Sequence, residues 1–299
     1  MARAAELSER GILSRVERRM PGVRVTLGTV HVVLLIILIG VGLLPLLWLA
    51  KSAVSTTQDT VTNPLALFPS GRIDWQNLAD AWTTGRIGQF LINTAEIAAG
   101  TVVSTLIVGL SAAYVISVLR PKWAPLFFTA ILATLFIPGV VSLVPLYLTV
   151  VSLPPFGVSL LNTYWAIWLP ASANAVVVVI VQRFFDAIPR EIFDAARVDG
   201  AGAFRTFTLI AVPLSRPIIG VVALLTVVNS WKDFLWPLIV INDSSRQPIS
   251  VALAQTAQST SLSFQLAGMF LAVIVPVALF VVFQRSFLRG VSAASGVKG

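Results

Sequence analysis

Charged and amide side chains inside otherwise apolar segments are the residues of this sequence that could do chemistry. Such side chains are costly in a bilayer, so they usually face a bundle interior or a water-filled cavity and have a partner. Two roles remain open here: the residues line a polar route through the membrane, or Lys232 or Asp233 forms an ion pair that holds helices together, for instance with Glu96. The candidates for the polar route are Asn93, Glu96, Asn229, Lys232 and Asp233.

The composition indicates that these residues sit in a membrane protein. Of the 299 residues, 57% are hydrophobic and only 11% are charged, whereas a soluble domain has about 25% charged residues. Several apolar runs are long enough to span a bilayer as helices. The net charge of +8 would suggest nucleic acid in a soluble protein, but here it is explained by basic residues on the cytoplasmic loops of a membrane protein. We therefore expect an all-α polytopic membrane protein and no nucleic-acid partner.

Hydropathy and turn residues divide the chain into a basic N-terminal segment (1–26), a membrane domain (27–289) and a C-terminal tail (290–299). A short amphipathic helix at 74–82 is expected at the membrane interface. Three prolines, Pro125, Pro138 and Pro145, interrupt the third apolar run. The six predicted spans cover about 27–50, 89–119, 123–151, 163–181, 218–241 and 264–283.

The distribution of basic residues predicts the orientation. Six spans place both termini on one side of the membrane. That side carries 16 of the 21 Lys and Arg residues, the opposite side carries four, and Lys232 lies within a span. Because Lys and Arg accumulate on cytoplasmic loops, we expect both termini and the loop between the fourth and fifth spans to be cytoplasmic.

Several kinds of chemistry are absent from the sequence. There is no Cys, and His31 is the only histidine, which argues against a thiolate metal site or a His-based catalytic pair. No phosphate-binding loop of the G-x4-G-K-[ST] type occurs. Uphill transport would then need an ATPase partner or an ion gradient. Few in-span ionisable residues and no clear internal repeat favour the ATPase partner. We expect no catalytic, cofactor or metal site in this chain.

The loop from Pro189 to Pro217 contains more predicted secondary structure than a loop that only joins two spans needs. Residues 190–198 favour a short helix, Gly200 suits its left-handed C-cap, and a second short helix can begin near Phe204. Opposite charges at Arg190–Asp194 and Asp194–Arg197 support the first helix. A helix this short is marginal by itself and needs a partner, either another protein or its own bundle. The apolar face expected to meet that partner comprises Ile192, Phe193, Ala196 and, more loosely, Val198.

This loop resembles the EAA loop of permease subunits in binding-protein-dependent ABC importers. The sequence Asp194-Ala195-Ala196-x3-Gly200-x9-Ile210-x-Val212-Pro213 matches the spacing Glu-Ala-Ala-x3-Gly-x9-Ile-x-Leu-Pro, with Asp in place of Glu and Val in place of Leu. The resemblance implies a coupling helix that sits in a cleft of a cytoplasmic ATPase. The implied docking residues are Glu191, Phe193, Asp194, Ala195, Ala196, Asp199, Gly200 and Pro213.

Two more stretches resemble carbohydrate permeases, so that the resemblance covers about residues 27–299. The stretch from Asn229 to Leu238, with Trp231, Asp233 and Trp236, is similar to their W-x-D-F-x-W-P-L pattern. The C-terminus resembles the maltose-transport type, with Ser295-Gly296-Val297 where Gly-Ala-Val is common. In that type the tail reaches the ATPase dimer interface. The tail residues implied in this contact are Gly296, Val297, Lys298 and Gly299.

The resemblance implies half of a transmembrane pore that imports a mono- or oligosaccharide by alternating access. It implies four kinds of partner besides lipid: a second permease subunit, two copies of a nucleotide-binding ATPase that binds ATP and Mg²⁺, an extracytoplasmic solute-binding protein, and the sugar. Three alternatives stay open. They are a permease of the same superfamily for another solute such as glycerol phosphate, an ion-coupled carrier that acts alone, and a membrane scaffold without a transport role.

Overall fold

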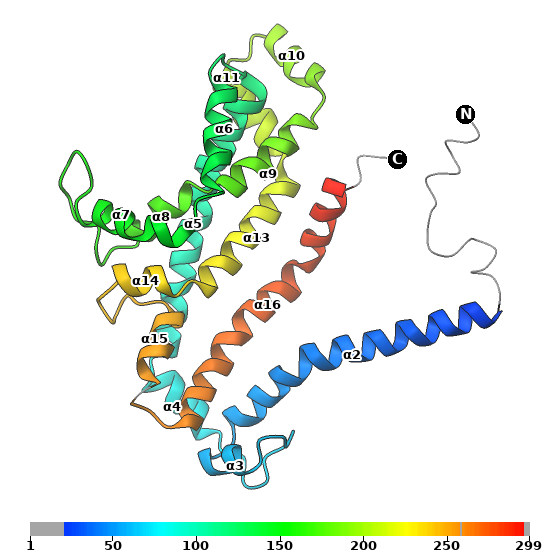
Figure 1. The fold of residues 1–299 in the computed structure, drawn as a ribbon, viewed down its shortest axis with the longest axis vertical. Coiled ribbons are helices and arrows are strands. Elements are labelled where there is room, and N and C mark those ends of the chain that lie inside the picture. The colour runs from blue at the N-terminus through cyan, green and yellow to red at the C-terminus, as the bar shows by residue number, and fades with distance from the viewer. Residues whose placement is uncertain (1–20, 258, 296–299) are drawn as a thin grey trace.

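The computed structural model describes residues 21–257 and 259–295. Nearly all of the regular secondary structure in these ranges is helical (Figure 1). Within the described ranges, the β pairing consists of one isolated bridge between Leu153 and Val158. The expectation of an all-α fold is confirmed. Most of the predicted N-terminal segment, and the tail residues Gly296, Val297, Lys298 and Gly299, lie outside the described residues.

Three long helices are apolar enough to cross a membrane by themselves. They are α2 (Pro21–Ala53), α5 (Ile87–Tyr114), which continues into the π-helix η3 (Val115–Leu119), and α16 (Leu262–Ser295). Their apolar parts correspond to the predicted first, second and sixth spans. Helix α16 continues through Ser295, into the segment 290–299 that was predicted as a C-terminal tail.

Three further pairs of helices are each bent at a short break. Helices α6 (Ala124–Thr134) and α7 (Gly139–Val151) differ in direction by 107°, and α8 (Trp165–Ser172) and α9 (Ala175–Asp186) by 46°. The segment Ala203–Leu214 meets α13 (Arg216–Lys232) at 76°. If each pair crosses once, the described residues contain up to six spans; otherwise they contain three.

Three predicted spans are not single helices. The third is two helices nearly at right angles, because Pro138, in the N-cap position of α7, disfavours helical geometry at the residue before it. The fifth ends at Lys232, and the chain resumes as the short α14 (Leu235–Val240). At the break in the fourth, the Asn174 side chain caps α9 by accepting a hydrogen bond from the Val177 N–H at 3.1 Å.

Short helices connect or cover the long ones. The expected interfacial helix at 74–82 is present as α4 (Gln76–Thr83), and the expected helix at 190–198 is present as α10. Helix α10 spans Arg190–Val198, and the remaining short elements are α3 (Thr57–Thr62), α11 (Ala203–Thr206), η4 (Phe207–Ala211), α12 (Val212–Leu214) and α15 (Ile249–Thr256).

Helix α5 is the centre of the bundle, and α2 lies at its edge. Helix α5 packs against α8, α9 and α13 and also touches α4, α15 and α16. Helix α2 packs mainly on α16 and extends away from the other helices (Figure 1). None of the residues in the most apolar stretch of α2 is buried. Because an apolar helix in a bilayer needs no protein cover, the exposed α2 is consistent with a membrane location.

Candidate functional site

Helix α10 ends in a hydrogen-bonded turn that requires a left-handed residue. Gly200 has φ +76°, a conformation that costs little for glycine alone. The Ala201 N–H donates to the Ala196 carbonyl at 2.9 Å, and the Gly200 N–H donates to the Arg197 carbonyl at 3.0 Å. These two bonds are those of a Schellman motif, which satisfies the last carbonyl groups of a helix. The expected role of Gly200 in ending the helix is therefore confirmed.

The two faces of α10 have different surroundings. Phe193 is 1% exposed, and it belongs to a buried cluster with Tyr114, Phe185 and Val222, while Ala196 is buried beside it. Val198, expected more loosely on this face, is 87% exposed. It lies five residues after Phe193, about 140° around a helix of 3.6 residues per turn, so that part of the expectation was wrong. The exposed docking candidates are Glu191, Asp194, Ala195, Asp199 and Gly200.

One of the two expected ion pairs on α10 forms, and the other is replaced. Arg197 and Asp194 pair at 3.1 Å, as the spacing predicts. Arg190 does not pair with Asp194; its guanidinium lies 3.6 Å from Asp186, the last residue of α9. This pair links the start of α10 to the end of a membrane helix.

Asp186 is the centre of a polar network that the sequence reasoning missed. Its carboxylate accepts hydrogen bonds from the Ser117 hydroxyl at 2.6 Å, from Arg120 at 3.3 Å and from the Gln182 amide. We call Ser117, Arg120, Gln182, Asp186 and Arg190 the Asp186 network. The spacing of Gln182, Asp186 and Arg190, four residues apart each time, was the available signal. Ser117 and Arg120 lie too far away in sequence to be paired with Asp186 by inspection.

Pro213 lies in the bent segment that joins α10 to α13. It is half-buried within α12, and the chain turns by 76° at the junction with α13. Ser215, at this junction, is fully buried, and its hydroxyl donates to the Ala211 carbonyl at 2.7 Å. The segment from Ala203 to Ser215 therefore connects the exposed helix α10 to an apolar helix through a fixed bend.

Three of the five candidates for a polar route line one cavity in the bundle. Asn229, Lys232 and Asp233 lie at the end of α13 and border a cavity of about 310 Å³, whose other walls come from α5, α8, α14 and Asn174, the residue that caps α9. Sequence reasoning missed the remaining polar residues of the lining. Two of them on α5 lie four residues apart, as do two on α13, and this spacing was the available signal. These residues are Thr101, Thr105, Asn174, Thr226 and Ser230.

The other two candidates, Asn93 and Glu96, do not border this cavity. Asn93 is buried, and its amide donates to the carbonyl oxygens of Ser245 and Gln247 at 2.8 and 2.9 Å. It holds the loop after α14 against α5. Glu96 is exposed. Among the described residues, neither Glu96 nor Lys232 or Asp233 lies within 4.0 Å of an opposite charge, so the expected ion pair between spans does not form in this conformation.

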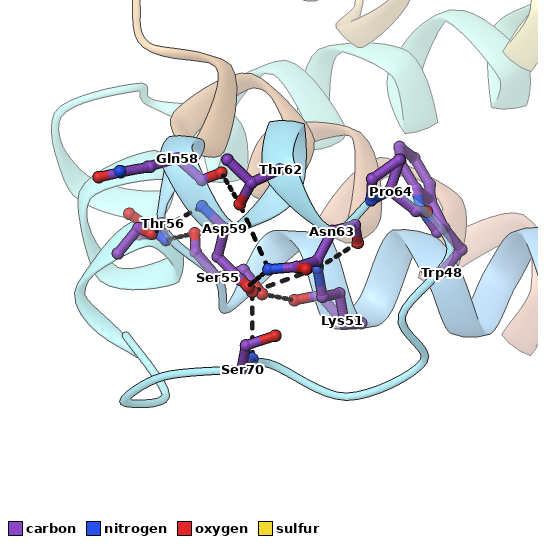
Figure 2. A network of polar contacts seen from close by, with 11 residues as sticks. Trp48, Lys51, Ser55, Thr56, Gln58, Asp59, Thr62, Asn63, Pro64 and Ser70 are labelled. Carbon is purple, nitrogen blue, oxygen red and sulfur yellow. Dashed lines mark hydrogen bonds and ion pairs between the residues drawn. The ribbon is translucent and has the colours of Figure 1, made fainter.

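A second polar network lies at the other end of the molecule, where α2 meets α3 (Figure 2). Lys51 and Asp59 pair at 3.2 Å, with side chains only 1% and 10% exposed. Asp59 also accepts hydrogen bonds from the Asn63 amide at 3.0 Å and the Ser70 N–H at 3.4 Å. Chiefly because of the bond from Asn63, and helped by Lys51, the pKa of Asp59 is lowered to about 2. We call Lys51, Asp59, Asn63 and Ser70 the Asp59 network.

Comparison with known proteins identifies the family. The profile of the "binding-protein-dependent transport system inner membrane component" family matches residues 87–293. The chain is 30% identical over 268 residues to the sn-glycerol-3-phosphate transport system permease protein UgpE of Rhizobium meliloti, covering 86% of this chain and 93% of UgpE. It is 31% identical over 263 residues to the arabinooligosaccharides transport system permease protein AraQ of Halalkalibacterium halodurans, covering 87% and 92%.

A solved structure supports the fold. One chain of a bacterial ABC transporter involved in the import of the acidic polysaccharide alginate superimposes with a TM-score of 0.75 at 21% identity, covering 92% of this chain and 98% of that one. The family match and the similarity to UgpE and AraQ confirm the resemblance drawn from the sequence motifs. This chain belongs to the family of binding-protein-dependent transport system inner membrane components, the permease subunits of ABC importers.

Proposed function

We propose that this chain forms half of the translocation pore of an ATP-driven sugar importer and couples that pore to a cytoplasmic ATPase through α10. The observation that carries the proposal is the division of α10 into two faces. Phe193 and Ala196 anchor the helix in the bundle, while Glu191, Asp194 and Asp199 remain exposed for a partner. In this proposal the termini are cytoplasmic, ATP and Mg²⁺ bind to the partner, and Gly296–Gly299 contact the ATPase dimer.

The arrangement of the bend supports movement of α10 together with the pore. Helix α10 is attached to α9 by the Arg190–Asp186 pair and to α13 by the bent segment Ala203–Leu214. Helix α13 lines the polar cavity, and Asn174, which caps the start of α9, also borders it. A rigid-body displacement of α10 by an ATPase would therefore be transmitted to two walls of the cavity. Such movement is the kind that alternating access requires.

The cavity suits a polyhydroxylated solute. Its polar lining is mainly hydroxyl and amide groups, from Thr101, Thr105, Asn174, Thr226 and Asn229, and these groups both donate and accept hydrogen bonds. A sugar hydroxyl likewise does both. A volume of about 310 Å³ is at the lower end of the usual range for small-molecule sites, roughly 300–1,000 Å³. The similarity to AraQ adds to the preference for a sugar.

The similarity to UgpE keeps glycerol phosphate as a second candidate. A phosphate ester needs a cation to offset its charge, and Lys232 is the one cationic side chain among the described residues of the cavity lining. Uptake by the complete importer, measured with a sugar panel and glycerol phosphate, separates the candidates. We expect Lys232→Gln to change sugar uptake by less than about twofold. A response to glycerol phosphate alone, lost in Lys232→Gln, would replace the sugar assignment.

The coupling role is tested at Gly200. A Cβ added there meets nothing within 4 Å, so a substitution acts through backbone strain and not through a clash. Valine at φ +76° is strongly disfavoured, whereas asparagine tolerates the left-handed region. We expect Gly200→Val to lower solute-stimulated ATPase activity and uptake roughly tenfold, and Gly200→Asn to retain most of both.

Two outcomes would overturn the coupling proposal. Wild-type uptake in Gly200→Val, at equal amounts of membrane-inserted protein, would leave α10 without a coupling role and favour a scaffold. Gradient-driven uptake by this chain reconstituted without any partner would instead identify an ion-coupled carrier.

A further inference from the structure

A second cavity, of about 420 Å³, lies between η3, the start of α6 and the end of α9. Its apolar wall includes Ile116, Pro125 and Phe128, and its polar wall belongs partly to the Asp186 network. The cavity is separate from the one bordered by Asn229 and Asp233 and shares no lining residue with it. It has no part in the proposed solute route, so its polar groups need another explanation.

Gln182 carries an acceptor in this cavity that has no donor. The residue is 8% exposed, and its amide N–H₂ group donates to the Asp186 carboxylate. Its Oε1 is buried and has no hydrogen-bond partner among the described residues, which is rare in folded proteins because the lost hydration is not replaced. A ligand that donates an N–H or O–H group here would satisfy Oε1. The Asp186 carboxylate next to it, 29% exposed and already paired with Arg120 and Arg190, is a second acceptor for an N–H donor.

The turn after η3 instead carries groups that bind an anion. Arg120 and Lys122 both border the cavity and are exposed. Arg120 donates through Nε to the Ser117 carbonyl at 2.8 Å, which orients its guanidinium at the rim. Guanidinium and ammonium groups are the usual binders of phosphate oxygens. The cavity therefore presents Arg120 and Lys122, which attract an anion, beside Gln182 and Asp186, whose oxygens accept N–H donors; Arg120 and Asp186 are 3.3 Å apart.

The apolar surroundings place the cavity at a membrane surface. Helix α6 begins at the cavity and exposes Leu126 and Phe127, side chains that suit lipid tails. Trp123, immediately before α6, is exposed and packs edge-on against Phe127 at a centroid distance of 5.7 Å. Tryptophan is enriched at the height of lipid headgroups. A ligand in this cavity would therefore have its polar part at headgroup level and an apolar part along α6.

We propose that this cavity binds the headgroup of phosphatidylethanolamine, a phospholipid that carries both a phosphate and a primary ammonium group. The phosphate contacts Arg120 and Lys122, and the ammonium donates to Gln182 Oε1 and Asp186. The cytoplasmic leaflet follows from the orientation in the proposed function, but the site itself does not depend on it. Lipid binding and solute transport can therefore fail independently of each other.

The test is lipid retention by the complete purified importer, measured by native mass spectrometry after delipidation and exchange against single lipids. We expect wild-type protein to retain phosphatidylethanolamine about tenfold better than phosphatidylcholine, because the trimethylated headgroup has no N–H to donate. Phosphatidylglycerol, without an ammonium, is also expected to bind less well. Gln182→Leu should remove the preference over phosphatidylcholine, and Lys122→Gln should lower retention of all three lipids severalfold.

Arg205→Gln is the matched control, because Arg205 is exposed on α11 and does not border the cavity. It should leave lipid retention unchanged. If Gln182→Leu does not fold, the exposed Lys122→Gln and the comparison of lipids on wild-type protein still decide the question. Equal retention of the three lipids by wild type would overturn the proposal. Displacement of the lipid by millimolar inorganic phosphate would also overturn it, and would identify a site for a free anion.

Discussion

The two ends of this permease each carry an aspartate that gathers side chains from several segments, but the two networks differ in how they are enclosed. At the α2–α3 end, Asp59 pairs with a single cation, and the Lys51 side chain is 1% exposed. At the α10 end, Asp186 is 29% exposed and shares its carboxylate between Arg120 and Arg190, whose side chains are 60% and 35% exposed. The Lys51–Asp59 pair is therefore shielded from solvent, although Asn63 and Ser70 of its network are exposed, whereas the pairs of Asp186 are open to solvent.

This difference indicates different roles. The partners of Asp59 all lie between residues 51 and 70, so the network fixes the local path of the chain where α2 ends. The partners of Asp186 come from η3, the following turn, α9 and α10. A network that joins separate helices, with exchangeable and partly hydrated cations, can change partners at small cost. We therefore expect loss of stability when the Asp59 network is broken and loss of coupling when the Asp186 network is broken.

The largest effect is expected for Lys51→Met. The substitution leaves the Asp59 carboxylate without its cation in an enclosed position, and breaking an enclosed pair from one side is strongly destabilising. We expect the Tm of the purified importer to fall by on the order of 10 °C. The double variant Lys51→Met/Asp59→Asn should recover at least half of that loss.

The exposed Arg246–Asp243 pair provides the control for this prediction. Its side chains are 54% and 42% exposed, and such surface pairs contribute little. Arg246→Gln should change the Tm by no more than about 2 °C. If Lys51→Met had an equally small effect, the description of the Lys51–Asp59 pair as shielded and stabilising would be wrong.

The second-largest effect is expected for Asp186→Asn, and it concerns the coupling between the ATPase and the pore. The asparagine retains an oxygen for Ser117 but no longer attracts Arg190 at the start of α10. We expect solute-stimulated ATPase activity and uptake to fall about fivefold, the size of a lost charge-assisted contact, while the Tm falls less than in Lys51→Met. Asp59→Asn should show the opposite pattern, with normal uptake per folded importer. Equal patterns for the two variants would remove the distinction between the networks.

A smaller effect is expected when the two arginines of the Asp186 network are compared. Arg190 is the less exposed of the two and belongs to α10, whereas Arg120 precedes α6. Arg190→Gln should therefore lower stimulated ATPase activity about threefold and Arg120→Gln less than twofold, because more exposed pairs are weaker. The measurement is ATPase activity with and without solute in the same preparation. The reverse order would mean that Asp186 acts mainly through α6.

The sequence predicted the parts of this structure that depend on local pattern. Helix α10, its end at Gly200 and the three long apolar helices follow from periodicity, capping residues and hydropathy. The break at Pro138 was recognisable, but its direction was not, because the 107° turn depends on what α6 and α7 pack against.

The networks could not be predicted because their contacts are distant in sequence. Asp186 meets Ser117 across 69 residues, and no local spacing relates the two. Asn93 was assigned to the polar route because it lies within a span. Its partners are carbonyl groups of residues 245 and 247, more than 150 residues away, and only folding reveals them. Position within a span therefore identifies costly polar groups but not the role of each.

The smallest effect within the physiological range is expected from pH, and it tests whether the Lys51–Asp59 pair is as shielded as the distances indicate. The pKa of Asp59 is about 2 in the folded protein, below its ordinary value of 3.8. A carboxylate with a lowered folded-state pKa contributes stability above its unfolded pKa, and this contribution is lost as the pH falls through the folded pKa. The Tm difference between wild type and Asp59→Asn should stay constant from pH 8 to about pH 5 and shrink between about pH 4 and 2. A difference that already shrinks between pH 7 and 5 would show that Asp59 is not held ionised by Asn63 and Lys51.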